Sequence, residues 1–359
     1  MPRDFHDKPY DPGTLTKLRI FELYAQEWIP VFVSPEEPKF DQVEIFDFFC
    51  GPGKDFAGVH GSPLRILTQL RNYHVRGMAG WNKISITVHL YDEDSEKIQT
   101  LENTLRAENW SIPGVKIECK ALAFKDALLA HQRMLSDRGV AKLLIIDQYG
   151  VDEVTDAIFK QLVSFQTADF IFFLSSSTLH RFRDHPAIKQ KIEKPDDSYD
   201  VHRVAVDYYR KLIPSDAKFF LGRFSIRKRS NIYGLVFGSR HPLGIHKFLQ
   251  VAWANDEIAG EANFDIEREN ITPNEGILNL EVMRPNKQRE FEQELSTEII
   301  AGRIKSEADA VRFAIEAGMT CRHCAPTLKE LKRKGVIDLD FQVPDIKRLK
   351  APRAIRLVQ

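Results

Sequence analysis

The sequence predicts an α/β protein in which a seven-stranded, mostly parallel sheet ends in an antiparallel hairpin and a small helical unit follows. Between residues 43 and 174, five short apolar runs alternate with helical patterns, which is typical of parallel strands joined by helices. Two further apolar runs, residues 218–224 and 232–237, are separated by a short polar connection and therefore predict the hairpin.

The individual elements follow from periodicity and from start signals. Residues 15–31 place apolar side chains at helical spacing. Residues 43–49 are short, apolar and rich in Val, Ile and Phe, which predicts a buried strand. Ser62 and Pro63 have the form of an N-cap and a first helical position. The remaining strands are expected at 84–91, 115–122, 142–146 and 169–174, and the helices between them at 95–108, 124–136 and 152–165.

Length and composition set broad limits. A chain of 359 residues with 43% hydrophobic content can bury the core of a large domain and a small one. Lys plus Arg and Asp plus Glu both number 51, so any basic surface has to be local. No apolar stretch approaches the roughly 18 residues of a membrane span, and the N-terminus has no secretory signal, so a cytoplasmic protein is expected. The four cysteines include one lone CxxC at Cys321 and Cys324, for which no metal site is predicted.

The stretch from Asp47 to Gly53, which reads DFFCGPG, is the most informative motif. Glycine is needed where the backbone approaches a ligand closely, because a Cβ atom would collide with it. The form DxFxGxG resembles the first motif of S-adenosylmethionine-dependent methyltransferases, and it lacks the third glycine of a dinucleotide motif at position 56. A tight turn after a strand is the alternative. The cofactor-binding candidates are Asp47, Phe49, Gly51, Pro52, Gly53 and Asp92.

Asp92 closes the second predicted strand, where Rossmann-like enzymes place the carboxylate that accepts the ribose hydroxyls of their cofactor. Acids at a strand exit also cap the following helix, and Asp94 or Ser95 could do so here.

The fourth predicted strand ends in Asp147-Gln148-Tyr149-Gly150. This tetrapeptide resembles the aspartate-proline-proline-aromatic motif of amino-methyltransferases, in which the acid accepts hydrogen bonds from the target amine and the aromatic ring stacks on the base. Asp147 and Tyr149 are therefore the catalytic candidates. Gln148 stands where proline is expected, so the motif favours a site here and leaves an amine target open.

A basic cluster surrounds the predicted hairpin turn. If the last strand runs antiparallel, the turn lies at the same sheet edge as Gly51 and Asp147, where positive charge would hold a polyanion. A solvated turn is the alternative reading. The candidates for nucleic-acid contact at this turn are Arg227, Lys228 and Arg229.

The C-terminal unit has the outline of a winged helix-turn-helix, with helices expected at 289–300, 306–317 and 322–334 and a strand at 336–341. The predicted division is a Rossmann-like domain at 1–255, a connector at 256–288 and a winged-helix domain at 289–359. Basic residues on the last helix and the wing suit contact with DNA or RNA, although winged helices also dock proteins. The candidates are Arg322, Lys329, Arg333 and Arg348.

Together these stretches resemble the three-Cys-motif partner family, TcmP, over nearly the whole chain. The segments that carry the resemblance are 17–28, 46–53 with 61–64, 90–94, 145–150, and 239–244 with Trp253. It implies a Rossmann-like methyltransferase fold, S-adenosylmethionine as cofactor, and a partner that resembles radical S-adenosylmethionine proteins and carries the three cysteines itself. The chain departs from the family at Gln148, and Leu122-Ala123 offers no acid for the adenine.

Two functions remain open on the sequence alone. The first is an S-adenosylmethionine-dependent methyltransferase that acts on nucleic acid. The second is a non-catalytic Rossmann-like adaptor that delivers a partner protein to nucleic acid through its winged helix. A nucleotide hydrolase is disfavoured because the chain has no GxxxxGK[ST] loop.

Overall fold

The computed structural model describes residues 8–148, 153–174, 201–228, 231–266 and 285–358. The chain divides into two compact units, Met1–His241 and Pro242–Gln359, and each is described by itself. Within the described residues, no helix is both long enough and apolar enough to cross a membrane.

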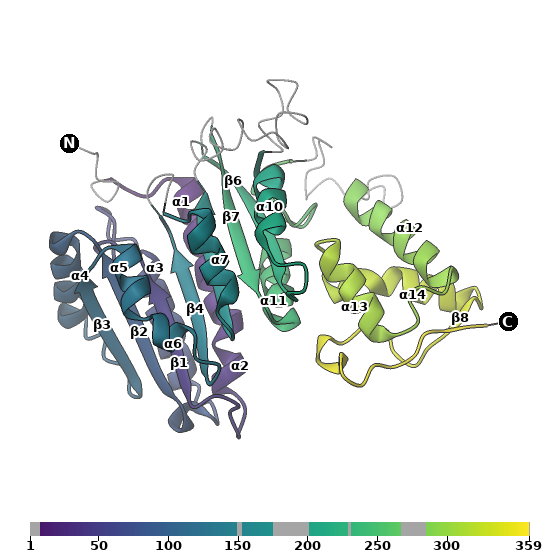
Figure 1. Ribbon diagram of the computed structural model, residues 1–359, viewed down its shortest axis with the longest axis horizontal. Coiled ribbons are helices and arrows are strands. Elements are labelled where there is room, and N and C mark those ends of the chain that lie inside the picture. The colour runs from purple at the N-terminus through teal and green to yellow at the C-terminus, as the bar shows by residue number, and fades with distance from the viewer. Residues whose placement is uncertain (1–7, 149–152, 175–200, 229–230, 267–284, 359) are drawn as a thin grey trace. The chain divides into compact units, whose positions relative to one another are not determined.

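In the described part of the first unit, seven strands form one sheet in the order β3-β2-β1-β4-β5-β7-β6 (Figure 1). Strands β1 to β5 are parallel, whereas β7 runs antiparallel to β5 and β6. This order with one reversed strand is the Rossmann-like methyltransferase arrangement, so the predicted fold class is confirmed for this unit. The strands are β1 (Gln42–Asp47), β2 (Ser85–Asp92), β3 (Val115–Ala121), β4 (Val140–Ile146), β5 (Ala168–Leu174), β6 (Phe220–Lys228) and β7 (Asn231–Ser239).

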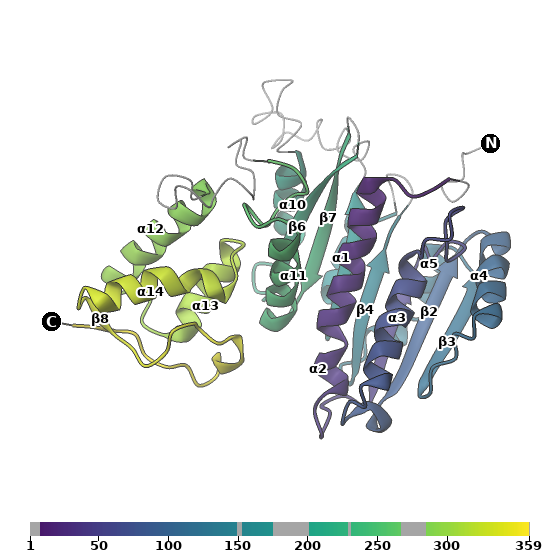
Figure 2. The ribbon, with the colours of Figure 1, turned by 180° about the vertical axis from the view of Figure 1, so that it is seen from behind.

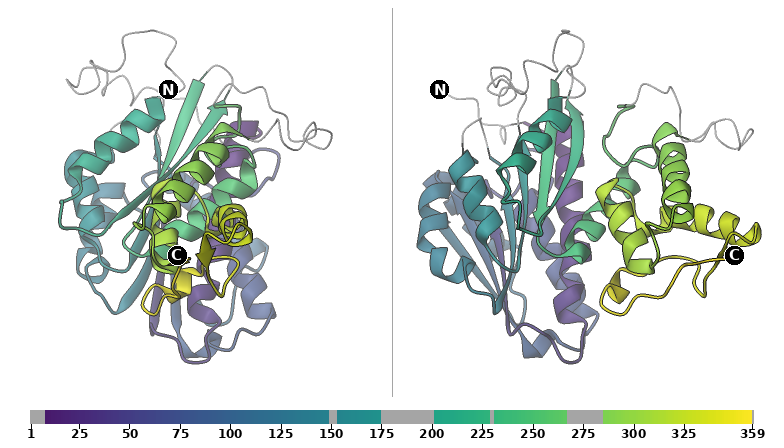
Figure 3. Two further views of the ribbon diagram at one scale, coloured as in Figure 1. Left: turned by 90° about the vertical axis from the view of Figure 1, so that its right-hand side faces the viewer. Right: turned by 45° about the vertical axis from the view of Figure 1, so that its right-hand side comes forward.

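Helices cover both faces of this sheet, as the rotated views show (Figure 3). One face carries α1 (Pro12–Trp28) and α3 (Ser62–Val75), seen in Figure 2. The other carries α5 (Phe124–Ala130), α7 (Asp156–Ser164) and α10 (Val201–Leu212), seen in Figure 1. Further elements of this unit are α2 (Pro30–Val33), the 3-10 turn η2 (Trp81–Lys83), α4 (Ser95–Ala107) and α6 (Gln132–Leu135).

Aromatic packing fixes the helices on the second face. Phe159 of α7 and Tyr209 of α10 lie with ring centroids 4.6 Å apart, and both pack on Phe172 of β5. All three side chains are buried, and each contributes about 1.5–3 kcal/mol through the apolar surface that it removes from water. These contacts hold α7 and α10 against β5 on this face of the sheet.

Two long helices predicted in the first unit are divided in the structure. The first ends at Trp28 and a separate short helix begins at Pro30, because proline has no N–H to continue the hydrogen-bond ladder. The helix predicted at 124–136 is divided at His131, whose φ of −101° and ψ of 6° lie outside the helical region.

The second unit begins with α11 (Pro242–Asn255), which the sequence analysis assigned to the first domain. Trp253 of this helix belongs to the apolar core of the second unit and donates from Nε1 to the Gly318 carbonyl at 3.0 Å. The helix therefore extends the second unit at its start. The remaining elements are α12 (Asn286–Ile300), α13 (Glu307–Glu316), η4 (Cys321–His323), α14 (Cys324–Arg333), β8 (Ile337–Asp338), η5 (Ile346–Arg348) and β9 (Arg356–Leu357).

The end of the chain pairs with two other segments of this unit. Strand β9 pairs antiparallel with β8, and Ala354 forms an antiparallel bridge with Ser306. The fully buried Glu307 carboxylate accepts from the Arg353 guanidinium and from the backbone N–H of Asp345, which fixes the intervening loop. Three helices are thus followed by a paired strand segment. The helix predicted at 322–334 is divided into η4 and α14, and the strand predicted at 336–341 is limited to Ile337–Asp338.

Candidate functional site

The parallel strands bring three aspartates to one edge of the sheet. Asp47 is the last residue of β1, Asp92 the last of β2, and Asp147 follows β4 directly. In the register, Asp47 is paired with Leu90 of β2 and with Ile145 of β4. Residues separated by about a hundred positions in the sequence therefore meet where α/β sheets bind their ligands, outside the carboxyl ends of the strands.

The glycine loop leaves β1 through two left-handed residues, Gly51 with φ of 60° and Gly53 with φ of 86°. The Gly53 carbonyl accepts from the Gly61 N–H at 2.8 Å, which closes the loop just before α3. A Cβ atom on Gly53 would lie 2.6 Å from Leu101 Cδ1 of α4. Glycine is required at this position both by the left-handed backbone conformation and by the close packing against α4. The sequence analysis had predicted only one reason for glycine here, the close approach of the backbone to a ligand.

The two other candidates in the loop are half-buried. Phe49 packs against Phe124 of α5, with ring centroids 5.6 Å apart. Pro52 lies between the two left-handed glycines. Both residues belong to the glycine loop, and both side chains are partly exposed.

Asp92 holds the glycine loop against the end of β2. Its Oδ2 atom accepts from the Gly51 N–H at 3.1 Å, and its Oδ1 atom accepts from the Asp94 N–H at 3.0 Å. The helix that follows is capped by Asp94, which accepts from the Glu96 N–H at 2.9 Å. Asp92 is therefore not the cap of α4. Its carboxylate is half-buried and keeps lone pairs for further donors.

Asp47 is fully buried at the end of β1. Burial raises the pKa of its carboxyl to about 7, and the nearby carboxylates of Asp147 and Asp92 add to the rise. Its Oδ2 atom has no hydrogen-bond partner among the described residues. The Ser62 hydroxyl is near enough to oppose the rise but does not meet hydrogen-bond geometry. An acceptor with this environment suits a cationic donor such as the amino group of an amino acid.

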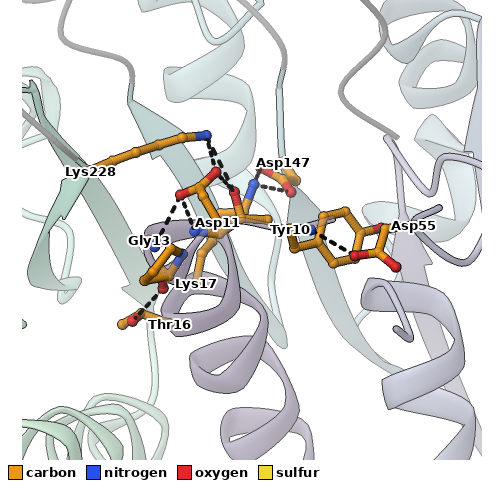
Figure 4. A network of polar contacts seen from close by, with 10 residues as sticks. Tyr10, Asp11, Gly13, Thr16, Lys17, Asp55, Asp147 and Lys228 are labelled. Atoms are coloured by element: carbon orange, nitrogen blue, oxygen red, sulfur yellow. Dashed lines mark hydrogen bonds and ion pairs between the residues drawn. The ribbon is translucent and has the colours of Figure 1, made fainter. Parts of the chain in front are cut away.

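Residues ahead of α1 cross the same edge (Figure 4). The Tyr10 N–H donates to Asp55 Oδ2 in the glycine loop at 2.7 Å. Burial, with the carboxylates of Asp55 and Asp147, raises the pKa of the Tyr10 hydroxyl. The next residue, Asp11, pairs with Lys228 Nζ at the tip of the hairpin at 2.7 Å. The hairpin tip thus lies at the edge where the antiparallel strand order predicted it.

Lys17 is the site residue that the sequence analysis missed. It extends from the first turns of α1, and its ammonium lies 2.6 Å from Asp147 Oδ1 and 2.5 Å from Oδ2 (Figure 4). The same ammonium lies 4.7 Å from the centre of the Phe173 ring. Each side chain of the pair is 14% exposed. No local motif marks Lys17, because 130 residues separate it from its partner.

Gln148 turns away from this pair. It is buried, its Nε2 atom donates to the Phe173 carbonyl at 2.7 Å, and its Oε1 atom accepts from the Val154 N–H at 3.1 Å. These two bonds tie the end of β4 to β5 and to the segment before α7. The glutamine, which stands where the sequence analysis expected proline, therefore fixes the end of β4 by hydrogen bonds. Tyr149, the second catalytic candidate, and Arg229 of the hairpin turn lie outside the described residues.

The basic candidates of the second unit lie on its surface. Arg322, Lys329 and Arg348 are exposed and form no ion pair within the described part of the chain. Arg333 is exposed as well, and Glu330 accepts from its guanidinium at 2.8 and 3.0 Å. Lys329 and Arg333 are four residues apart on α14 and therefore share one face of that helix, whereas Arg322 lies in the 3-10 turn η4 before it.

No family model matches the sequence, and a search of curated proteins finds no relative. Among solved structures, an rRNA methylase from Streptococcus thermophilus matches at 10% identity and a TM-score of 0.33, over 65% of this chain and 98% of that one. A SAM-dependent methyltransferase from Agrobacterium tumefaciens matches at 9% identity and a TM-score of 0.35, over 64% and 63%. The O-methyltransferase TomG from Streptomyces achromogenes, solved in complex with SAM, matches at 8% identity and a TM-score of 0.33, over 64% and 90%.

The sequence identities and TM-scores of these matches are low, and the fold class of the first unit is therefore assigned from its strand order. The first unit has the Rossmann-like methyltransferase fold. Its glycine loop and its three edge aspartates stand at the carboxyl ends of the strands, where a cofactor site of this fold is expected.

Proposed function

We propose that the chain is an S-adenosylmethionine-dependent methyltransferase. The observation that carries the proposal is the coupling of the Gly51 N–H to Asp92, beside a buried acceptor on Asp47 that lacks a partner among the described residues. In this proposal Gly51, Pro52 and Gly53 bind the methionine part, Asp92 accepts from the ribose hydroxyls, and Asp47 faces the amino group. When bound, the cofactor would supply an activated methyl group, and Asp147 with Tyr149 would position the acceptor.

The proposed acceptor is a nucleic acid. Arg227 and Lys228 at the hairpin tip support it, because positive charge beside the site would hold a phosphate backbone. In the second unit, the order of α12, α13 and α14 and the pairing of β8, β9 and Ser306 support a winged helix. In this proposal, helix α14 and the basic residues of the wing, which include Arg348, contact a nucleic-acid duplex. We also propose that the chain acts together with a three-Cys-motif partner protein. This part of the proposal is supported by the sequence resemblance alone.

Calorimetry with S-adenosylmethionine tests the cofactor site. We expect binding by the wild-type protein, a loss in Gly51→Val, and an affinity about tenfold lower or more in Asp92→Ala, since a hydrogen bond to a charged group contributes about 1.5–3 kcal/mol. Glu93→Ala is the matched control, because Glu93 is the exposed neighbour of Asp92. Wild-type protein that releases no heat, alone or with its partner, would exclude the enzyme and leave the adaptor.

A salt series with short duplexes tests the second unit. We expect affinity to fall steeply with salt, and the double variant Arg322→Ala/Lys329→Ala to reduce that slope by about 1–2. Arg303→Ala is the control, because it removes one charge from the same unit and its guanidinium is already paired with Glu298. An affinity that is indifferent to salt contradicts phosphate contact.

A further inference from the structure

The ion pair between Lys17 and Asp147 bears on which atom receives the methyl group. An acid at the end of the fourth strand is expected to accept hydrogen bonds from a target amine, yet here its Oδ1 atom already accepts from the Lys17 ammonium, which also lies 2.5 Å from its Oδ2 atom. An ammonium has three donors. Lys17 has no further hydrogen-bond acceptor in the part of the chain that the structure describes. The site therefore presents a cation and a carboxylate together.

On the basis of the proposed function, we propose that the acceptor is a ribose 2′-hydroxyl of RNA, bound between the Lys17 ammonium and the Asp147 carboxylate. Lys17 acts as a positioning and charge-stabilising residue, and Asp147 takes the proton.

The charges favour oxygen over nitrogen as the acceptor atom. An amine that attacks a methyl group develops positive charge, which a fixed ammonium at hydrogen-bond distance opposes. A hydroxyl has to lose its proton and develops negative charge on oxygen, which the same ammonium stabilises. The low exposure of the pair, 14% for each side chain, strengthens both effects, because water screens them less.

The proton can be accounted for without a further group. As the hydroxyl oxygen bonds to the methyl carbon, the carbon–sulfur bond of the donor breaks with its electron pair on sulfur, and the hydroxyl proton passes to Asp147 and then to solvent. A carboxylate has about four lone-pair sites, so Asp147 can accept this proton while it still holds Lys17. Lys17 keeps its own proton throughout and therefore remains the cation that the oxygen needs.

Ribose is the source of the hydroxyl that fits the rest of the proposed site. The hairpin tip at this edge carries Arg227 and Lys228, which suit a phosphate backbone. The bases of nucleic acids offer ring and exocyclic nitrogens, whereas the 2′-hydroxyl is the group that RNA adds along its whole length and that DNA lacks.

The test combines product analysis with binding. RNA and DNA of one sequence are incubated with the full-length protein and labelled S-adenosylmethionine, then digested to nucleosides for mass spectrometry. We expect the label on ribose of RNA and none on DNA. Lys17→Met should lower kcat by roughly 10²–10³-fold, as the loss of a charge-stabilising donor does, with a smaller change in KM. Lys17→Arg should recover part of the rate.

Two measurements keep a folding defect apart from a catalytic one. Calorimetry should give S-adenosylmethionine the same affinity for Lys17→Met as for the wild type, because Lys17 is not in the proposed cofactor site. The double variant Lys17→Met/Asp147→Asn removes both charges, so it should fold and bind cofactor and stay inactive. Lys160→Met is the matched control, since Lys160 is an exposed lysine on α7.

Each outcome decides between the two proposals. Label on a base nitrogen, equal transfer to DNA, or full activity of Lys17→Met overturns the hydroxyl inference and leaves the methyltransferase proposal standing. Cofactor binding without transfer to RNA overturns it as well. A wild-type protein that does not bind S-adenosylmethionine at all overturns the proposed function itself.

Discussion

Replacement of Gly53 by alanine tests how the glycine loop is held. Two costs can be separated at this position. Its φ of 86° lies in the left-handed region, which costs an L-residue about 1–2 kcal/mol. The new Cβ would also lie 2.6 Å from Leu101 Cδ1. Leu101 is fully buried, so the overlap behaves as overpacking and costs about 1–3 kcal/mol more.

Gly58 in the same loop provides a matched control. Its φ of 79° is close to that of Gly53, and a Cβ atom there would meet nothing within 4 Å. Gly58→Ala should therefore lower the free energy of unfolding by about 1–2 kcal/mol through the backbone alone. Gly53→Ala should lower it by about 2–5 kcal/mol, and the difference measures the contact with α4.

The assay is urea unfolding of the full chain, followed by calorimetry with S-adenosylmethionine. Gly53→Ala should weaken cofactor binding as well, because relief of the overlap has to move the loop that carries Gly51. Gly58→Ala should bind normally. If the two variants are equally stable within about 0.5 kcal/mol, the packing argument for Gly53 is refuted and only its backbone conformation matters.

Two further predictions concern buried polar groups. Burial raises the pKa of Asp169 to about 6, above the roughly 3.9 of an unfolded chain, so the folded protein binds more protons in this window and its stability falls as pH rises. Asp169→Asn removes that dependence, so its stability relative to wild type should improve by about 2 kcal/mol between pH 4 and pH 7 in urea unfolding. An offset that does not vary with pH would contradict this. Gln148→Ala leaves the Val154 N–H and the Phe173 carbonyl unpaired and should cost about 2–4 kcal/mol, and Gln148→Pro should cost at least as much. Gln132→Ala, at an exposed position, is the control, and a cost as small as its own would show that the two bonds do not fix the strand end.

Local patterns were sufficient to predict most of the first unit. Alternating apolar runs and helix starts predicted the strands in order, and the short connection at 225–231 predicted the antiparallel pair. Boundaries were less well predicted where one residue overrides periodicity, as Pro30 does at the end of α1. The domain boundary predicted at residue 255 differs from the division before Pro242, because the sequence does not show that Trp253 packs into the core of the second unit.

In the candidate site, too, local sequence patterns predicted some features, and contacts between distant segments decided others. Asp47, Asp92 and Asp147 could be identified because each follows a recognisable strand, and parallel strands present their carboxyl ends at one edge. The roles of their neighbours depended on contacts across the fold. Lys17 reaches Asp147 across 130 residues, and no spacing rule within a helix or strand relates the two.

The sequence by itself determined the strand segments along the chain, the glycine loop and the three aspartates, because propensity, hydrophobic period and turn residues are local properties. Only the tertiary structure decided that Asp94 caps α4 so that Asp92 can hold the glycine loop, and that Gln148 ties β4 to β5. It also decided that Asp147 faces a cation. These are pairings between side chains and backbone of distant segments, and they exist only after the sheet has brought those segments together.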